Sequence, residues 1–274
     1  MLIIGETLNT SRVSSCIRHV EAAVIARDEQ IIAQLAIAQR DYGATYIDIN
    51  AGTLTHGEAE ALEWMTVVAQ QATSLPISFD SPNPAALSAA LAVYDRRYGP
   101  PIINSISAES KRYAAILPLV QRYSARIIAL AMDDQGIQPS SSARLAVATA
   151  LVERLHTDGI PYEDIYLDPL VFPIATDDDV VMTTLDIIPH IMAAFPGVHT
   201  IAGISNVSHG LPARVVLNRA FTILAMGRGL DACIVDTQDR QLMSLLRAAE
   251  TLLGRDESCL SFLTRAREGA FVGL

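Results

Sequence analysis

Several short apolar runs in this sequence end in a single acid or amide. Asp80, Asn104 and Asp168 each close such a run, and Asn206 follows a fourth. Taken singly, each could cap a helix or a turn. One polar residue at the end of several buried strands is a poor way to build a core and a good way to build a ligand pocket. The recurrence at four strand ends therefore predicts a binding site.

The residue types indicate the chemistry of the ligand. A carboxylate accepts paired N–H groups, and an asparagine amide offers both a donor and an acceptor. A flat heterocycle with several N–H donors and a carbonyl, such as an aminopyrimidinone, matches that set, whereas phosphates and carboxylic acids would be repelled. The sequence has no Ser-His-Asp order with a nucleophile elbow, no H-E-x-x-H, no Schiff-base lysine candidate and no metal spacing among its histidines.

Other polar residues stand at the ends of the remaining apolar runs: Glu6, Asn9, Asp48, Asn50, Met132-Asp133-Asp134-Gln135 and Asp236. We include Glu6 and Asn50 among the candidate binding residues. Asp48 and Asp236 fall inside strands, where an acid could instead pair with inward donors of a barrel. Their role stays open at this point.

The elements that must position these residues follow a regular order. Near-continuous hydrophobicity, typical of parallel strands covered on both faces, marks eight runs. These are Leu2–Glu6, Thr45–Gly52, Pro76–Ser81, Pro101–Ser107, Ala125–Met132, Ile165–Val171, Thr200–Ser208 and Ala232–Thr237. Amphipathic segments separate them: Asp28–Tyr42, Gly57–Ala72, Pro84–Arg96, Glu109–Tyr123, Ser141–Thr157, Asp177–Phe195, Arg214–Gly227 and Arg240–Leu253.

Eight strands, each followed by a helix, predict an α/β fold, a single (β/α)8 TIM barrel. A doubly wound open sheet would need a glycine-rich turn after the first strand, and Gly5-Glu6-Thr7-Leu8-Asn9 is not G-x-G-x-x-G. Because no composition break marks a linker, we expect one domain over residues 1–274. The tail Ser258–Leu274 could be a final helix that packs on the barrel or on a partner.

Composition narrows the function classes. Half of the 274 residues are hydrophobic and 18% are charged, with a net charge of −10 and one lysine, Lys111, which argues against a nucleic-acid partner. The three cysteines are widely spaced and indicate neither a disulfide framework nor a zinc ribbon. Without a signal-like apolar segment or a membrane span, we expect a soluble, cytoplasmic protein.

The ordered motifs resemble the pterin-binding family, and within it the methyltetrahydrofolate:corrinoid protein methyltransferases and the folate-binding module of cobalamin-dependent methionine synthase. The resemblance covers essentially the whole chain. It depends on the order and spacing of Gly5-Glu6-Thr7-Leu8-Asn9, Ile47-Asp48-Ile49-Asn50, Phe79-Asp80-Ser81, Ile103-Asn104-Ser105, Asp168-Pro169-Leu170, Gly203-Ile204-Ser205-Asn206-Val207-Ser208 and Leu217-Asn218-Arg219-Ala220-Phe221.

The resemblance implies roles for several residues. The matching Asp80, Asn104 and Asp168 would bind the pterin ring, and Asn206 would reach its N5 as the catalytic residue. Gly203, Ser205 and Arg214 would line the same pocket. The resemblance also implies a barrel, commonly a homodimer, that moves a methyl group between N5 of tetrahydrofolate and the cobalt of a corrinoid carried by a partner protein. The direction of transfer stays open.

Alternatives within the same fold also stay open. Dihydropteroate synthase has a Thr-Pro-Asp-Ser-Phe loop after the first strand and a Ser-Arg-Lys at the seventh, where this chain has Asn9-Thr10-Ser11 and Ser205-Asn206-Val207. A non-catalytic pterin-binding subunit of a methyltransferase complex and a barrel of unrelated activity are two others. No D-x-H-x-x-G cobalamin module is present, so we expect the corrinoid on another polypeptide.

Overall fold

A closed ring of parallel strands forms the centre of the molecule. The computed structural model describes residues 1–11, 18–54, 56–176 and 179–271. Within them, the strands pair in sequence order and β8 returns to β1, which confirms the predicted barrel. Their bounds are β1 Leu2–Asn9, β2 Tyr46–Asn50, β3 Ile77–Asp80, β4 Ile102–Ser107, β5 Arg126–Leu130, β6 Ile165–Asp168, β7 His199–Gly203 and β8 Ala232–Val235.

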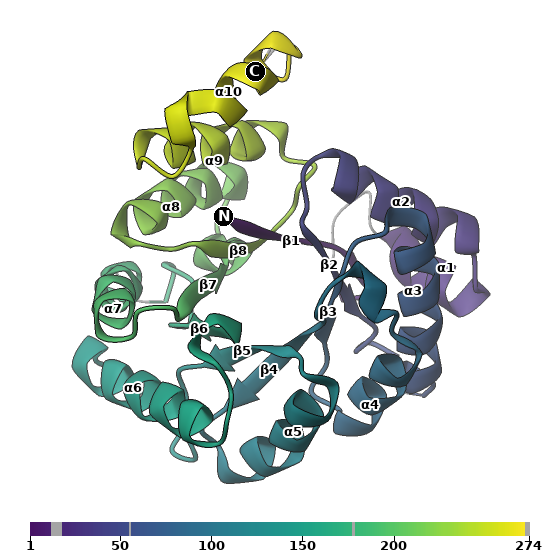
Figure 1. The fold of residues 1–274 in the computed structure, drawn as a ribbon, viewed down its shortest axis with the longest axis horizontal. Coiled ribbons are helices and arrows are strands. Elements are labelled where there is room, and N and C mark those ends of the chain that lie inside the picture. Colours follow the sequence, from purple (N-terminus) through teal and green to yellow (C-terminus); the bar gives the residue numbers. More distant parts are fainter. Residues whose placement is uncertain (12–17, 55, 177–178, 272–274) are drawn as a thin grey trace.

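Helices surround the ring, as Figure 1 shows, with α10 lying outside α9. The helices are α1 Arg18–Ala26, α2 Glu29–Asp41, α3 Glu58–Thr73, α4 Pro84–Val93, α5 Ser110–Tyr123, α6 Ser141–Thr157, α7 Val180–Ala194, α8 Arg214–Arg228, α9 Arg240–Leu252 and α10 Leu260–Arg267. Short 3-10 turns are η1 Arg96–Tyr98, η2 Tyr162–Asp164, η3 Ile204–Ser208 and η4 Glu257–Cys259. No helix of the described ranges is long and apolar enough to cross a membrane.

Local sequence signals set the helix boundaries. The side chain of Asp28 accepts a hydrogen bond from the backbone N–H of Ile31 at 3.1 Å and caps the start of α2. Gly43 follows the end of that helix with φ +106°, a conformation that suits glycine. Helix α1 was not expected from the sequence. The predicted helix Asp177–Phe195 is observed from Val180, and residues 177 and 178 lie outside the described residues.

The seventh strand is shorter than predicted. The run Thr200–Ser208 was expected to be one strand, but β7 ends at Gly203 and the chain enters the 3-10 turn η3. The turn closes with the N–H of His209 donating to the carbonyl of Asn206 at 3.1 Å. Continuous hydrophobicity marked the strand correctly, but the small polar residues after Ile204 favour a turn.

One layer of side chains fills the amino-terminal end of the barrel interior. Its buried members are Ile4, Tyr46, Ile102, Ile128, Tyr166, Ile201 and Ala232. Successive side chains of a strand point to opposite faces, so the residue two positions further along each strand also points inward. Those next positions include Glu6, Asp48, Asn104, Asp168 and Gly203. The alternation of the strands therefore stacks a polar layer directly on an apolar one.

Candidate active site at the carboxyl ends of the strands

The predicted site residues lie on one rim because all eight strands are parallel and closed in order. Asn50 and Asp80 end β2 and β3, and the amide of Asn50 donates to the carboxylate of Asp80 at 2.8 Å. The amide oxygen of Asn50 accepts a hydrogen bond from the N–H of Gly52 at 2.8 Å, which fixes the orientation of the amide. Two residues predicted separately are thus in direct contact.

Opposing effects act on the pKa of the Asp80 carboxyl group, which is raised overall. Burial raises the pKa of this carboxyl group, and the negative charge of Glu58 adds to that rise. The hydrogen bond from Asn50 and the positive charge of Arg112 lower the pKa again. Glu58 is itself held in place, because the Ser81 hydroxyl donates to it at 2.5 Å and the Asn83 amide at 3.0 Å.

Asp48 lies at the centre of this polar layer, with only 2% of its surface exposed. The hydroxyl of Ser78 donates to it at 2.7 Å, and the side chain of Asn104 is also hydrogen-bonded to it. Burial raises its pKa most, and the charges of Asp80 and Glu6 raise it further. The sequence left the role of Asp48 open. In the structure Asp48 is hydrogen-bonded to Asn104 and lies close enough to Glu6 and Asp80 for their charges to raise its pKa.

Asp168 stands on the other side of the rim, at the end of β6. Burial raises its pKa to about 7, although a hydrogen bond from the backbone N–H of Leu170 at 2.7 Å opposes the shift. Leu170 adopts φ +67°, the left-handed conformation, so the chain turns sharply after the aspartate. A carboxyl group that is half ionised near neutral pH, inside a rim, is typical of a functional position.

The segment after β7 carries Asn206. A Cβ on Gly203 would lie 3.2 Å from the amide nitrogen of Asn206, so glycine leaves room for that side chain to lie close to the strand end. Asn206 is exposed and Ser205 partly so. Arg214 donates to the carbonyl of Ser205 at 2.7 Å and to the hydroxyl of Ser208 at 3.1 Å. Arg214 therefore supports the turn that presents Asn206.

No cluster of three or more His, Cys, Asp or Glu residues that could hold a metal ion is present in the described part of the chain. Two histidines have other partners: His199 pairs with Asp231 at 2.6 Å, and His190 is hydrogen-bonded to a backbone carbonyl of its own helix. The side chains that meet at the rim are carboxylates, amides and hydroxyls.

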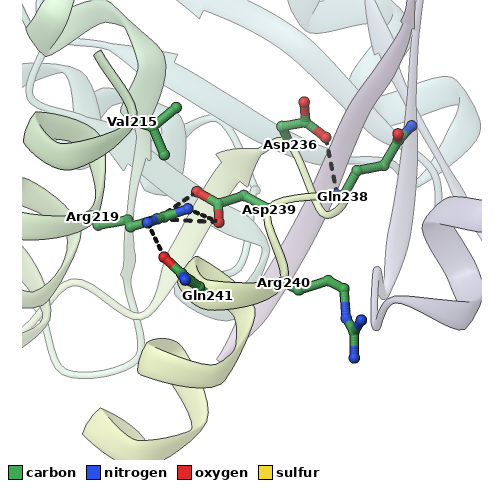
Figure 2. Close-up of a pocket in the computed structure, with 7 residues that line it drawn as sticks. All are labelled: Val215, Arg219, Asp236, Gln238, Asp239, Arg240 and Gln241. Carbon is green, nitrogen blue, oxygen red and sulfur yellow. Dashed lines mark hydrogen bonds and ion pairs between the residues drawn. The ribbon is translucent and has the colours of Figure 1, made fainter. Parts of the chain in front are cut away.

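A separate pocket of about 430 Å³ lies beside the rim, between the start of α8 and the start of α9 (Figure 2). Arg219 crosses it to form an ion pair with Asp239 at 2.7 Å and also contacts Gln241. Asp236, after β8, accepts from the N–H of Gln238 at 3.0 Å. The ion pair of Arg219 with Asp239 distinguishes this pocket from the barrel mouth, where acids and amides lie together.

Sequence reasoning missed the supporting residues of the site. Ser78 lies directly opposite Asp48 in the register of β2 and β3, and Arg112 reaches the loop after β3 and the backbone of β4 from α5. The only local signal was the alternation of Tyr46, Asp48 and Asn50, which places all three on one face of the strand. The partners across strands depend on register, which is not visible in a single segment.

Comparisons with known proteins agree with this geometry. A family model described as pterin binding enzyme matches residues 18–236. The chain is 33% identical over 271 residues to the methylcorrinoid:tetrahydrofolate methyltransferase of Eubacterium limosum, covering 98% of this chain and 97% of that protein. It is 30% identical over 249 residues to methionine synthase of Mycobacterium tuberculosis, covering 86% of this chain and 20% of that protein.

Solved structures share the fold. Dihydropteroate synthase from Xanthomonas albilineans, in complex with 7,8-dihydropteroate, superposes with a TM-score of 0.67 at 19% identity, covering 91% of this chain and 93% of that one. The enzyme from Coxiella burnetii, in complex with pteroic acid, gives 0.67 at 16% identity, with 92% and 94% covered. At these identities the likeness shows the fold alone.

The fold and rim define a (β/α)8 barrel with a polar binding face at the carboxyl ends of its strands. The chain belongs to the pterin-binding enzyme family, as the family model and the full-length relative show. The family resemblance expected from the ordered motifs is confirmed.

Proposed function

We propose that this protein is a methyltransferase that moves a methyl group between N5 of tetrahydrofolate and the cobalt of a corrinoid protein. The observation that carries the proposal is the placement of the carboxylates of Asp80 and Asp168 and the amide of Asn104 on inward-facing positions toward the carboxyl end of one closed parallel barrel. The full-length similarity to a methylcorrinoid:tetrahydrofolate methyltransferase supports it. The direction of transfer in the cell is not part of the proposal.

The ring chemistry fits the side chains. The pyrimidinone edge of a pterin presents several N–H donors beside a carbonyl, which carboxylates and a carboxamide can satisfy together. We assign ring binding to Asp80, Asn104 and Asp168, with Asn50 orienting Asp80. Glu6 contributes through its charge on Asp48. The apolar layer beneath, from Ile4 to Ala232, closes the barrel under the ring.

Asn206 is the residue assigned to the chemical step. Moving a methyl group from N5 to cobalt(I) expels an amine, which leaves poorly unless N5 gains positive charge. A hydrogen bond to N5 that strengthens in the transition state would supply this stabilisation. A carboxamide can act as donor or acceptor as N5 changes protonation, without a charge of its own to desolvate. The reverse reaction passes through the same transition state.

The corrinoid would arrive on a separate protein. The chain covers nearly the full length of the methylcorrinoid:tetrahydrofolate methyltransferase but matches only 20% of methionine synthase, and it has no D-x-H-x-x-G motif. Asn206 is exposed on the rim, where a large second substrate can approach it. A cytoplasmic location agrees with this chemistry, because cobalt(I) needs reducing surroundings and both described cysteines, Cys233 and Cys259, are free thiols.

Stopped-flow absorption spectroscopy tests the function. Mixing the purified protein with methyltetrahydrofolate and cobalt(I) cobalamin should convert the cobalt(I) spectrum to that of methylcobalamin, and methylcobalamin with tetrahydrofolate should run the reverse change. A protein that binds the folate and leaves both spectra unchanged would be a binding subunit. Condensation of p-aminobenzoate with a pterin pyrophosphate would identify a dihydropteroate synthase instead.

We also propose that the protein is a homodimer through the outer face of α8, α9 and α10. Large apolar side chains are exposed there, namely Val216, Leu224, Leu252 and Leu260, and Leu252 is 87% exposed. Helix α10 has no buried residue of its own, although short helices are usually stabilised by packing. Clustered apolar surface of this kind is typical of interfaces.

Sedimentation of the wild type and of two matched variants tests the dimer. Leu224→Glu should shift the protein to monomer, whereas Ile25→Glu, which changes an equally exposed side chain on α1, should leave the dimer intact. A monomeric wild type would refute the proposal.

A further inference from the structure

Arg112 connects the loop after β3 with strand β4. From the first turn of α5, its guanidinium group donates to the carbonyl of Ser105 with Nε at 3.1 Å and Nη2 at 2.7 Å. Nη1 donates to the carbonyl of Pro82 at 3.1 Å, and Nη2 lies 3.4 Å from the carbonyl of Ser81. One side chain thus holds the carbonyls of the adjacent Ser81 and Pro82 together with that of Ser105, which lies more than twenty residues later in the sequence.

The residues that it holds are the neighbours of two assigned ring-binding residues. Ser81 directly follows Asp80, and Ser105 directly follows Asn104. The two strand ends are also joined by the backbone, since the N–H of Ser81 donates to the carbonyl of Asn104 at 3.1 Å. Both Ser81 and Ser105 are buried, and the hydrogen bonds of Arg112 to their carbonyls are partly buried. A change in the guanidinium position would therefore move both binding side chains.

The charge of Arg112 acts at the same place. It lowers the pKa of the Asp80 carboxyl group against the burial that raises it. The other groups that bear on Asp80 are Asp48 and Glu58, which are acidic, and the neutral amide of Asn50. Burial lowers the pKa of Arg112, and the nearby charges of Glu109 and Asp80 oppose that shift. Among these charged groups, Arg112 is the one cation.

We propose that Arg112 is a positioning residue for pterin recognition, which fixes the carboxylate of Asp80 and the amide of Asn104 in one arrangement and keeps that carboxylate ready to accept hydrogen bonds. The inference depends on the proposed function for the identity of the ligand. Arginine suits the role because its planar fork presents several donors in fixed directions, while the compact ammonium of lysine cannot span three carbonyls.

Three variants separate the charge of Arg112 from its hydrogen bonds. Arg112→Met removes both, Arg112→Lys keeps the charge and loses the fork, and Arg122→Met removes an exposed arginine from the last turn of the same helix. The dissociation constant of methyltetrahydrofolate should rise about 10-fold or more in Arg112→Met, on the scale of a lost charge-assisted hydrogen-bond set. Arg112→Lys should show part of that loss, and Arg122→Met none.

The pH profile distinguishes positioning from a general loss of stability. Without the cation, Asp80 should bind a proton more readily, so in Arg112→Met the affinity for methyltetrahydrofolate should begin to fall at a higher pH than in the wild type. Arg112→Lys should keep the wild-type profile. Equal pH profiles and equal affinities in the wild type and Arg112→Met would overturn the inference.

Hydrogen exchange of the protein without ligand tests the clamp, meaning the hydrogen bonds of Arg112 to the carbonyls of Ser81, Pro82 and Ser105, independently of the function. In both Arg112 variants, the backbone amides of the segments 81–83 and 105–108 should exchange faster than in the wild type, while the rest of the barrel keeps its protection. Unchanged exchange there would refute the clamp even if methyl transfer is demonstrated. Faster exchange in a protein that binds no folate would instead refute the proposed function and leave the clamp standing.

Discussion

The two ends of this barrel treat ionisable side chains in opposite ways. At the amino end, Arg126 lies 3.5 Å from Asp164, donates to the hydroxyl of Tyr46 at 3.2 Å and stands over the ring of Tyr166 at 6.0 Å. His199 stacks on the same ring, with the centroids 4.7 Å apart. Arg126 and His199 thus each have an acidic partner, Asp164 and Asp231, and share the ring of Tyr166.

At the carboxyl end, acids face one another. Burial raises the pKa values of Asp48, Asp80 and Asp168, and the neighbouring acids add to the rise at Asp48 and Asp80. Groups that the protein itself leaves poorly compensated gain most from a ligand that supplies N–H donors. The same barrel thus pairs acids with cations or histidine at one end and gathers acids beside one another at the other, where the proposed function places the pterin ring.

Among substitutions at the two ends of the barrel, the largest effect is expected from one that impairs the chemical step. Asn206→Ala should lower the methyl-transfer rate by about 100-fold or more, on the scale of losing one preorganised donor. Single-turnover stopped-flow at saturating methyltetrahydrofolate measures it. His209→Ala, just after the same turn and likewise exposed, is the matched control because the contact of His209 with Asn206 uses its main-chain N–H. A fully active Asn206→Ala protein would contradict the assigned role.

The pH dependence of binding should come next in size. Ring N–H groups bind the ionised form of Asp168, whose pKa is about 7 in the free protein. Affinity for methyltetrahydrofolate should therefore be constant above pH 8 and fall as the pH drops through 7, by about 30-fold at pH 5.5. Titration calorimetry measures the profile. In Asp168→Asn the step near pH 7 should be lost, and a profile that keeps it would assign the step to another group.

Asp168 should also lower the free energy of unfolding at alkaline pH, where its buried carboxyl group is ionised. The pKa of Asp168 is raised from 3.8 to about 7 on folding, so its contribution to stability is fully present below pH 3.8 and is lost as the pH rises through 7. Relative to the wild type, Asp168→Asn should therefore gain stability with rising pH and be more stable at pH 8 by about 1–2 kcal/mol, allowing for partial exposure of the carboxyl group. Urea unfolding at pH 4 and pH 8 measures both values, and a variant that is less stable at pH 8 would contradict this account.

Much of this architecture was predictable from the sequence because its signals are local. Continuous apolar runs gave the strands, and the polar residue at the end of each run identified Asp80, Asn104 and Asp168 as rim positions. The end of β7 was placed too late, since hydrophobicity does not report the 3-10 turn that presents Asn206. Turn conformation depends on contacts such as that of Arg214 with Ser205, which form only in the folded chain.

The contacts across strands were not predictable in the same way. Asp48 meets Ser78 because β2 and β3 pair in one register, thirty residues apart in sequence. From the sequence, Arg112 is an ordinary surface position of an amphipathic helix, and only the fold brings the loop after β3 and the backbone of β4 beside it. A sequence pattern gives the face on which a side chain lies, whereas its partner depends on the barrel closure.

The smallest expected effect tests the amino end. Arg126→Met keeps the aliphatic stem over Tyr166 but removes the ion pair with Asp164 and the hydrogen bond to Tyr46. Because the group is partly exposed, the free energy of unfolding should fall by only about 1 kcal/mol. The rate of methyl transfer and the affinity for methyltetrahydrofolate should not change, since a layer of apolar side chains separates this end from the rim. Urea unfolding and single-turnover kinetics on the same preparation measure both; a variant of normal stability with impaired transfer would show that the two ends are coupled and that the amino end also serves the reaction.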